Sequence, residues 1–175
     1  MMRKKTVPFA LAESIYEVPK SFYLEHGIRF LLLDLDNTLV PYSVSYPDER
    51  FLSWAKEMED AGLSLCICSN NSGKRVSKFA LAAGCQYASY MRKPFSGPMK
   101  KLLKKKGWPQ EETLLIGDQI MTDVKAGNGA GVRCLLTEPL DSQEPPWTKF
   151  NRIFDRPKRN KIKEKGYAKP WKEIL

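Results

Sequence analysis

Short apolar runs that end in polar residues recur along the chain and predict the strands of a buried sheet. The first run, Phe30–Leu33, leads directly into Asp34 and Asp36. A run of this length fits either a strand buried on both faces or part of a buried helix. The polar residues Asn37 and Thr38, which end the apolar pattern, favour the strand. We therefore predict a strand that ends just before the two carboxylates.

Further runs of this kind alternate with segments of helical periodicity. We predict additional strands at residues 63–68, 87–88, 113–118 and 132–137. The predicted helices span residues 47–61, 74–83, 96–105 and, weakened by two glycines, 122–130. Strands that alternate with helices indicate an α/β domain with a parallel sheet. The expected sheet has about five strands, with helices on its flanks.

The two ends of the chain differ from this alternating middle. We predict a lead-in at residues 1–28 that packs on the sheet, the α/β core at 29–147, and a basic extension at 148–175. The extension holds ten Lys or Arg against three Asp or Glu, and the whole chain carries a net charge of +9. Such a segment suits an anionic partner: a membrane surface, a nucleic acid or an anionic substrate. A solvated, partly disordered end is the equal alternative.

Composition narrows the class of protein and of chemistry. With 175 residues, 42% hydrophobic and 28% charged, the chain is typical of one soluble globular domain. The apolar runs are too short to span a bilayer, and the basic start at residues 3–5 lacks an apolar signal-peptide core, so we expect a cytoplasmic protein. The four cysteines fit buried small side chains better than disulfides or a zinc site. A single histidine, His26, excludes multi-histidine metal sites.

Polar residues follow four of the predicted strands and can meet at one edge of the sheet. In chain order they are Asp34 and Asp36, Ser69 and Asn70, Lys93, and Asp118 with Asp123. Clustered carboxylates repel one another unless a cation holds them, and an all-oxygen set suits Mg²⁺. A hydroxyl, loop amides and a lysine can bind a phosphoryl group, and a carboxylate beside it can attack the phosphorus. Each segment alone could be a turn, a helix cap or, for Lys93, a solvated charge, but their coincidence at one edge favours an active site.

These segments resemble the four motifs of the haloacid dehalogenase superfamily of phosphatases. The matching stretches are Asp34-Leu-Asp36-Asn-Thr38, Ser69-Asn70-Asn71, Lys93-Pro94 and Gly117-Asp118-Gln119-Ile-Met-Thr-Asp123. The finer resemblance is to YqeG-type bacterial proteins, relatives of mitochondrial phosphatidylglycerophosphate phosphatase, over roughly residues 15–155. It rests on residues 27–39, 117–124 with 127–128, and 148–152. One departure is Gly129, where such proteins commonly carry an arginine.

The resemblance implies a Rossmann-like core and a role for each motif residue. Asp34 would be the nucleophile and a ligand of Mg²⁺. Asp36 would donate a proton to the leaving oxygen and later accept one from water, while its backbone carbonyl contacts the metal. Asp118 would supply the second metal carboxylate. The cation would offset the repulsion between an anionic nucleophile and an anionic substrate.

The remaining motif residues are implied to bind phosphate or to support the others. Ser69 and the amide of Asn70 would hold the phosphoryl oxygens, and Lys93 would balance their charge. Asp123 would orient metal-bound water or Lys93, and Thr38 would support the first loop.

The spacing of the motifs leaves no room for a cap domain. Residues 38–69 and 69–93 each hold little more than one helix and one strand. An open site suits a phosphate that is presented by something large, such as a lipid head group, a polynucleotide end or a phosphoprotein. The basic extension is compatible with the first two.

We therefore predict a Mg²⁺-dependent phosphomonoesterase that acts through an aspartyl-phosphate, with phosphatidylglycerophosphate as the substrate implied by the resemblance. The expected partners are a phosphorylated substrate and anionic lipid at a membrane surface; nucleic acid is less favoured. The alternatives are a phosphatase for nucleic-acid ends or a soluble metabolite, and a non-catalytic RNA- or ribosome-associated binding protein. A neighbouring subunit could serve as the missing lid.

Overall fold

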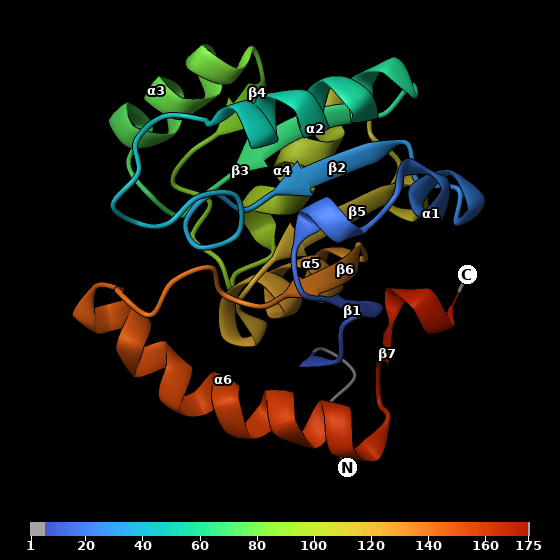
Figure 1. Cartoon of the computed structure of the whole chain (residues 1–175), viewed down its shortest axis with the longest axis vertical. Helices are drawn as coiled ribbons and strands as arrows, with labels where there is room; N and C mark the ends of the chain where they lie inside the picture. The colour runs from blue at the N-terminus through green and yellow to red at the C-terminus, as the bar shows by residue number, and fades with distance from the viewer. Residues whose placement is uncertain (1–5, 175) are drawn as a thin grey trace.

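A parallel sheet of seven strands forms the centre of the computed structural model, which describes residues 6–174 (Figure 1). The strand order is β4-β3-β2-β5-β6-β1-β7. The strands are β1 (Ala10–Ala12), β2 (Phe30–Leu33), β3 (Ser64–Cys68), β4 (Gln86–Ala88), β5 (Thr113–Gly117), β6 (Arg133–Thr137) and β7 (Lys169–Pro170). The α/β class is as predicted, but the sheet has seven strands where the sequence predicted about five. The basic start at residues 3–5 lies outside the described residues.

Helices connect the strands and cover both faces of the sheet. They are α1 (Lys20–Glu25), α2 (Glu49–Asp60), α3 (Gly73–Ala83), α4 (Gly97–Lys106), α5 (Lys125–Ala130) and α6 (Pro146–Lys165). Short 3-10 segments occupy Ile15–Glu17, Gln110–Glu112 and Trp171–Glu173, and a π-helix occupies Ile120–Val124. The helix predicted at residues 122–130 is thus divided between this π-helix and α5.

Alternating side chains along the strands separate two hydrophobic cores. In β2, Leu31 and Leu33 pack on one side with Phe51 of α2, whereas Leu32 packs on the other side with Met99 of α4. Successive side chains of a strand point to opposite faces, so a strand buried on both sides needs an unbroken apolar run. The central strands therefore show no alternation of polar and apolar residues in the sequence.

The ends of the central helices follow local sequence signals. The Asp48 carboxylate accepts a hydrogen bond of 2.8 Å from the amide of Phe51 and caps the start of α2. Gly84 and Gly107 end α3 and α4 in the left-handed region, with φ of 68° and 66°. Glycine has no Cβ to clash in that conformation. These signals place the loops that carry the motif residues.

Both ends of the chain join the sheet. Strand β1 lies between β6 and β7 and pairs in parallel with each. The ring of Phe22 in α1 also lies 6.0 Å from that of Trp171, measured between centroids. The sequence did not predict these strands of three and two residues, because they form through tertiary pairing of the two chain ends. The boundaries predicted at residues 28 and 147 stay a prediction.

The C-terminal extension is structured rather than disordered. Residues 146–165 form α6, the long helix that runs along the core in Figure 1. Its inner face is buried through Thr148, Arg152, Asp155, Arg159 and Ile162. A partly disordered end, one of the two alternatives from sequence, is therefore wrong for these residues.

The cysteines confirm one smaller prediction. All four cysteines are buried and free, as small core side chains. The His26 ring is half-buried beside Phe22, with Nδ1 2.8 Å from the carbonyl oxygen of Phe22. Within residues 6–174, no helix is both long enough and apolar enough to cross a bilayer.

Candidate active site

The predicted site residues meet at the carboxyl edge of the sheet. Asp34 directly follows β2, Ser69 follows β3 and Asp118 follows β5, and these strands run parallel. Lys93 reaches the same place from the loop after β4. These loops surround a cavity of about 240 Å³. Its lining includes Asp34, Asp36, Ser69, Asn70, Lys93, Glu144, Trp147, Thr148 and Asn151.

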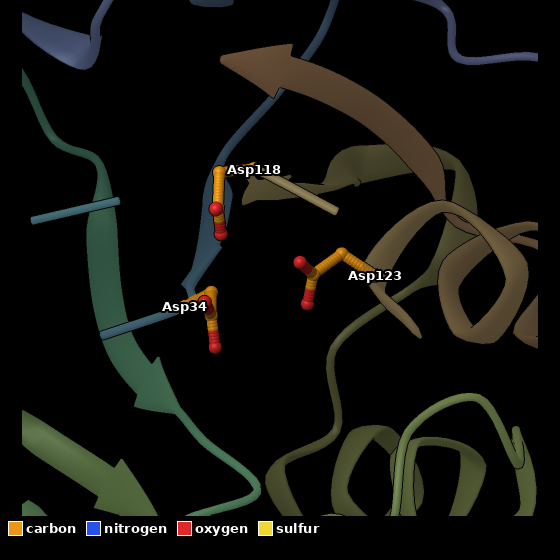
Figure 2. Close-up of side chains that lie close together, drawn as sticks. All are labelled: Asp34, Asp118 and Asp123. Atoms are coloured by element: carbon orange, nitrogen blue, oxygen red, sulfur yellow. The ribbon is translucent and has the colours of Figure 1, made fainter. Parts of the chain in front are cut away.

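Three carboxylates form a buried cluster at this edge. Asp34, Asp118 and Asp123 each place one oxygen within 4.8 Å of the others (Figure 2). The Thr38 hydroxyl donates to Asp118 Oδ1 at 3.1 Å and also lies 3.4 Å from Asp34 Oδ2. At Gly117 a Cβ would lie 2.6 Å from Asp123 Oδ2, so only glycine admits the third carboxylate here. The local sequence thus makes room for the cluster.

Lys93 supplies positive charge to the cluster. Its ammonium donates to Asp34 Oδ1 at 2.6 Å and to the carbonyl oxygen of Cys68 at 2.9 Å, and it lies 2.7 Å from Asp123 Oδ1. Burial alone would lower the pKa of Lys93, but the carboxylates of Asp123 and Asp34 hold that pKa well above its ordinary value. The ammonium therefore stays charged in the buried site.

Asn70 positions Lys93 through two side-chain hydrogen bonds. Its Oδ1 accepts from the backbone amide of Lys93 at 2.7 Å, and its Nδ2 donates to the Lys93 carbonyl oxygen at 2.8 Å. The Ser69 hydroxyl lines the cavity and accepts from the amide of Asn71 at 3.1 Å. The phosphate contacts predicted for Ser69 and for the Asn70 amide stay a prediction.

The Asp36 carboxylate lies at the cavity but outside the cluster. It accepts hydrogen bonds from Arg75 Nε at 2.8 Å and Nη2 at 2.6 Å, and from Asn71 Nδ2 at 3.1 Å. These donors fix its orientation on the side of the cavity next to α3. The metal contact predicted through the Asp36 backbone carbonyl stays a prediction, as does its proton-transfer role. Sequence reasoning missed Arg75, which carries no motif signal.

Sequence reasoning also missed the function of Arg152, the second cation of the cluster. Its guanidinium pairs with Asp118 Oδ2, donates to the Asp118 carbonyl oxygen at 3.0 Å and donates to Glu144 Oε2 at 3.1 Å. Arg159, also in α6, donates to the same carbonyl oxygen at 2.7 Å. Arg152 lies in residues 148–152, one of the stretches on which the resemblance rests, but it is one of ten Lys or Arg in the basic extension. Its spacing from the other motifs gave no sign of a contact with Asp118.

Asn37 ties the loop after β2 to the loop after β6. Its φ of 63° lies in the left-handed region that asparagine tolerates. Its side chain donates to Glu144 Oε1 at 2.6 Å and to the Asp141 carbonyl oxygen at 3.1 Å. Glu144 thereby connects Asn37 to Arg152, and the loop over residues 138–145 is held against the site.

The residues of the cluster fit a divalent cation. Burial, followed by the charge of Asp123, raises the pKa of Asp34 well above its ordinary value, and burial raises the pKa of Asp118 to about 6. Three carboxylates face two cationic side chains, and Arg152 is shared with Glu144. Added positive charge would stabilise the ionised carboxylates. Because every available donor is a hard oxygen, the set suits Mg²⁺.

Comparison with known proteins agrees with the fold and with the family resemblance. A family model described as HAD-hydrolase-like matches residues 90–139. The Bacillus subtilis protein "Probable phosphatase YqeG" is 30% identical over 173 residues, which cover 99% of this chain and 100% of that protein. An Arabidopsis thaliana protein named phosphatidylglycerophosphate phosphatase 1 is 23% identical over 83% of this chain but only 44% of its own length.

A solved structure shares the fold. The cobalt-bound deoxy-D-mannose-octulosonate 8-phosphate phosphatase of Haemophilus influenzae superposes with a TM-score of 0.52 at 18% identity, over 74% of this chain and 77% of that one. The chain therefore belongs to the haloacid dehalogenase superfamily, within the YqeG group of phosphatases.

The Gly129 departure has a local packing explanation. A Cβ at Gly129 would lie 3.0 Å from Ser96 Cβ at the start of α4. Any larger residue would require Ser96 to move. The glycine thus accommodates the close approach of α4 and α5.

We predict that Arg152→Met destabilises the metal-free protein. The change leaves buried Asp118 and Glu144 without their cation, which typically costs about 3 kcal/mol or more of unfolding free energy. Urea unfolding in EDTA measures this loss. Saturating MgCl₂ should stabilise the variant more than the wild type, since the ion then supplies charge that Arg152 no longer provides.

Arg156→Met is the matched control, because Arg156 is exposed on the same helix. Its loss should stay within about 0.5 kcal/mol. Equal stability of the two variants in EDTA would contradict the role assigned to Arg152.

Proposed function

We propose that this phosphatase hydrolyses phosphate monoesters with Mg²⁺ bound, through an aspartyl-phosphate intermediate. The observation that carries the proposal is the buried cluster of Asp34, Asp118 and Asp123 with Lys93, of which Asp34 and Lys93 line a cavity together with Ser69. A buried carboxylate held by a lysine beside a phosphate-sized cavity suits nucleophilic attack on phosphorus.

In the proposed complex, the phosphoryl group occupies the cavity. The Ser69 hydroxyl, the Asn70 amide and the Lys93 ammonium bind its oxygens. Asp34, Asp118 and the backbone carbonyl of Asp36 would hold Mg²⁺, and Asp123 orients Lys93. When bound, Mg²⁺ neutralises substrate charge and so reduces the repulsion that an anionic nucleophile meets.

The proposed reaction has two steps. An oxygen of Asp34 attacks phosphorus, the bond from phosphorus to the ester oxygen breaks, and Asp36 gives the departing alkoxide its proton. Asp36 then accepts a proton from a water molecule, which attacks the phosphorus of the aspartyl-phosphate. This attack releases inorganic phosphate and restores the Asp34 carboxylate. Hydrogen bonds from Arg75 and Asn71 hold the Asp36 carboxyl group at the cavity, within the space proposed for the substrate.

The proposed substrate is a phosphate ester on a large molecule, with phosphatidylglycerophosphate as the leading case. Between β2 and β3 the chain holds only the helix α2, and between β3 and β4 only α3, so the described residues provide no cap domain. The name of the Arabidopsis relative supports the lipid. We further propose a cytoplasmic protein that contacts the membrane surface. Phosphorylated nucleic-acid ends and soluble metabolites are the alternatives.

Asp34→Asn should lower phosphate release at least about a thousand-fold, because the amide is a poor nucleophile. The assay would present phosphatidylglycerophosphate, a 5′-phosphorylated oligonucleotide and a sugar phosphate, each with MgCl₂. Asp60→Asn, an exposed change at the end of α2, is the control and should leave turnover unchanged. Fast turnover of another substrate, with none of the lipid, would refute the lipid assignment. Full activity of Asp34→Asn would refute the mechanism.

Asp36→Asn should trap the phosphorylated protein when the substrate is an aryl phosphate. An aryl oxide leaves without a proton, so the first step survives, whereas the second step lacks its base. Intact-protein mass spectrometry after an acid quench would detect phosphate on Asp34 in this variant but not in the wild type. Slow turnover without any trapped phosphate would mean that Asp36 does not serve as the base.

A further inference from the structure

The outer face of α6 carries an exposed apolar stripe. Trp147, Phe150, Ile153 and Phe154, here called the aromatic stripe, are 65%, 60%, 64% and 45% exposed. Spacings of three and four residues place them on one face of the helix. The rings of Phe150 and Phe154 also contact each other, with centroids 5.4 Å apart. Contiguous exposed apolar surface of this kind marks an interaction site.

The polarity of α6 is inverted relative to an ordinary surface helix. Its inner face buries the charged side chains of Arg152, Asp155 and Arg159, which bind Asp118, the loop after it and the end of β6. A surface helix normally turns its apolar face inward and its polar face to solvent. Folding of the domain therefore does not account for the apolar residues on the outer face of α6.

Basic residues flank the aromatic stripe. By helical periodicity Lys149 and Arg156 lie along one side of it and Lys158 along the other, and Lys161 follows it toward the C-terminal end of α6. Lys158 Nζ stands 5.9 Å from the centre of the Phe154 ring. Across α6 there are eight Lys or Arg against two Asp or Glu. Apolar residues bordered by Lys and Arg are typical of helices that lie in the interface of an anionic membrane.

The stripe begins at the rim of the cavity. Trp147, Thr148 and Asn151, in the first turns of α6, line the cavity together with Asp34. Figure 1 shows the N-terminal end of α6 on the same side of the molecule as the carboxyl end of β2. Further exposed apolar residues lie on the loops after β2 and β4, namely Val44, Tyr46, Tyr90 and Phe95. A flat surface that contacts the stripe would therefore lie next to the site opening.

We propose that the aromatic stripe docks this phosphatase on the surface of an anionic lipid bilayer and so presents the cavity to phosphate esters in that bilayer. The expected gain in turnover of phosphate esters in the bilayer rests on the proposed function, whereas the expected binding to the bilayer does not. A single-stranded nucleic acid could also stack on aromatic rings. The stripe favours lipid because it includes aliphatic Ile153, and because the groove beside Ile153 is lined by four Asp or Glu as well as four Lys or Arg, which does not suit a polyanion.

Vesicle binding tests the docking directly. Trp147 is the exposed tryptophan, while Trp54, Trp108 and Trp171 are buried, so a blue shift on binding reports the stripe. The full chain should bind vesicles of phosphatidylglycerol and phosphatidylcholine, with a blue shift, and bind pure phosphatidylcholine vesicles more weakly. The double change Phe150→Ser, Phe154→Ser should weaken this binding at least about tenfold. Leu81→Ser, an exposed apolar change on α3, should leave it unchanged.

Turnover assays separate the docking from the chemistry. The double variant should keep wild-type turnover of a soluble aryl phosphate and lose at least about tenfold on a phosphate ester carried in vesicles. Vesicle binding by a wild type that hydrolyses neither substrate would refute the proposed function and leave the docking supported. Equal vesicle binding by wild type and double variant would overturn the docking. So would binding of the wild type to an oligonucleotide but not to vesicles.

Discussion

The site depends on an excess of negative charge buried at one edge of the sheet, where three carboxylates face two cationic side chains. Three aspartates from two loops share a small volume, and Lys93 and Arg152 reach them from separate parts of the chain. Burying charged groups is costly unless opposite charges and hydrogen bonds accompany them. Three neighbours hold this arrangement: Thr38 donates to Asp118, Asn70 positions Lys93, and Gly117 leaves the space that Asp123 occupies.

Helix α6 connects this buried charge to the outer surface. Its inner residues complete the cluster through Arg152 and support the backbone after Asp118 through Asp155 and Arg159. Its outer residues form the aromatic stripe beside the cavity. Displacing α6 would thus uncover a buried carboxylate, so the structure links the proposed lipid contact to the integrity of the site.

The central fold and the position of the motif residues could be predicted because each depends on local signals. Unbroken apolar runs located β2, β3, β5 and β6, and parallel topology then placed the residues after them at one edge. Partners from distant segments could not be predicted. Their contacts span 34 residues for Arg152 with Asp118, 39 for Arg75 with Asp36 and 107 for Glu144 with Asn37. Strands β1 and β7 are too short to show a period, and their pairing comes from tertiary packing.

On this view the aspartate cluster binds a divalent cation that Lys93 and Arg152 cannot replace. Isothermal titration calorimetry with MgCl₂, in the absence of substrate, tests it most directly. We expect saturable binding of about one ion per chain, lost in Asp118→Asn and retained in Asp141→Asn, since Asp141 lies in the loop after β6 and outside the cluster. Equal Mg²⁺ affinity in wild type and Asp118→Asn, or no binding by the wild type, would contradict it.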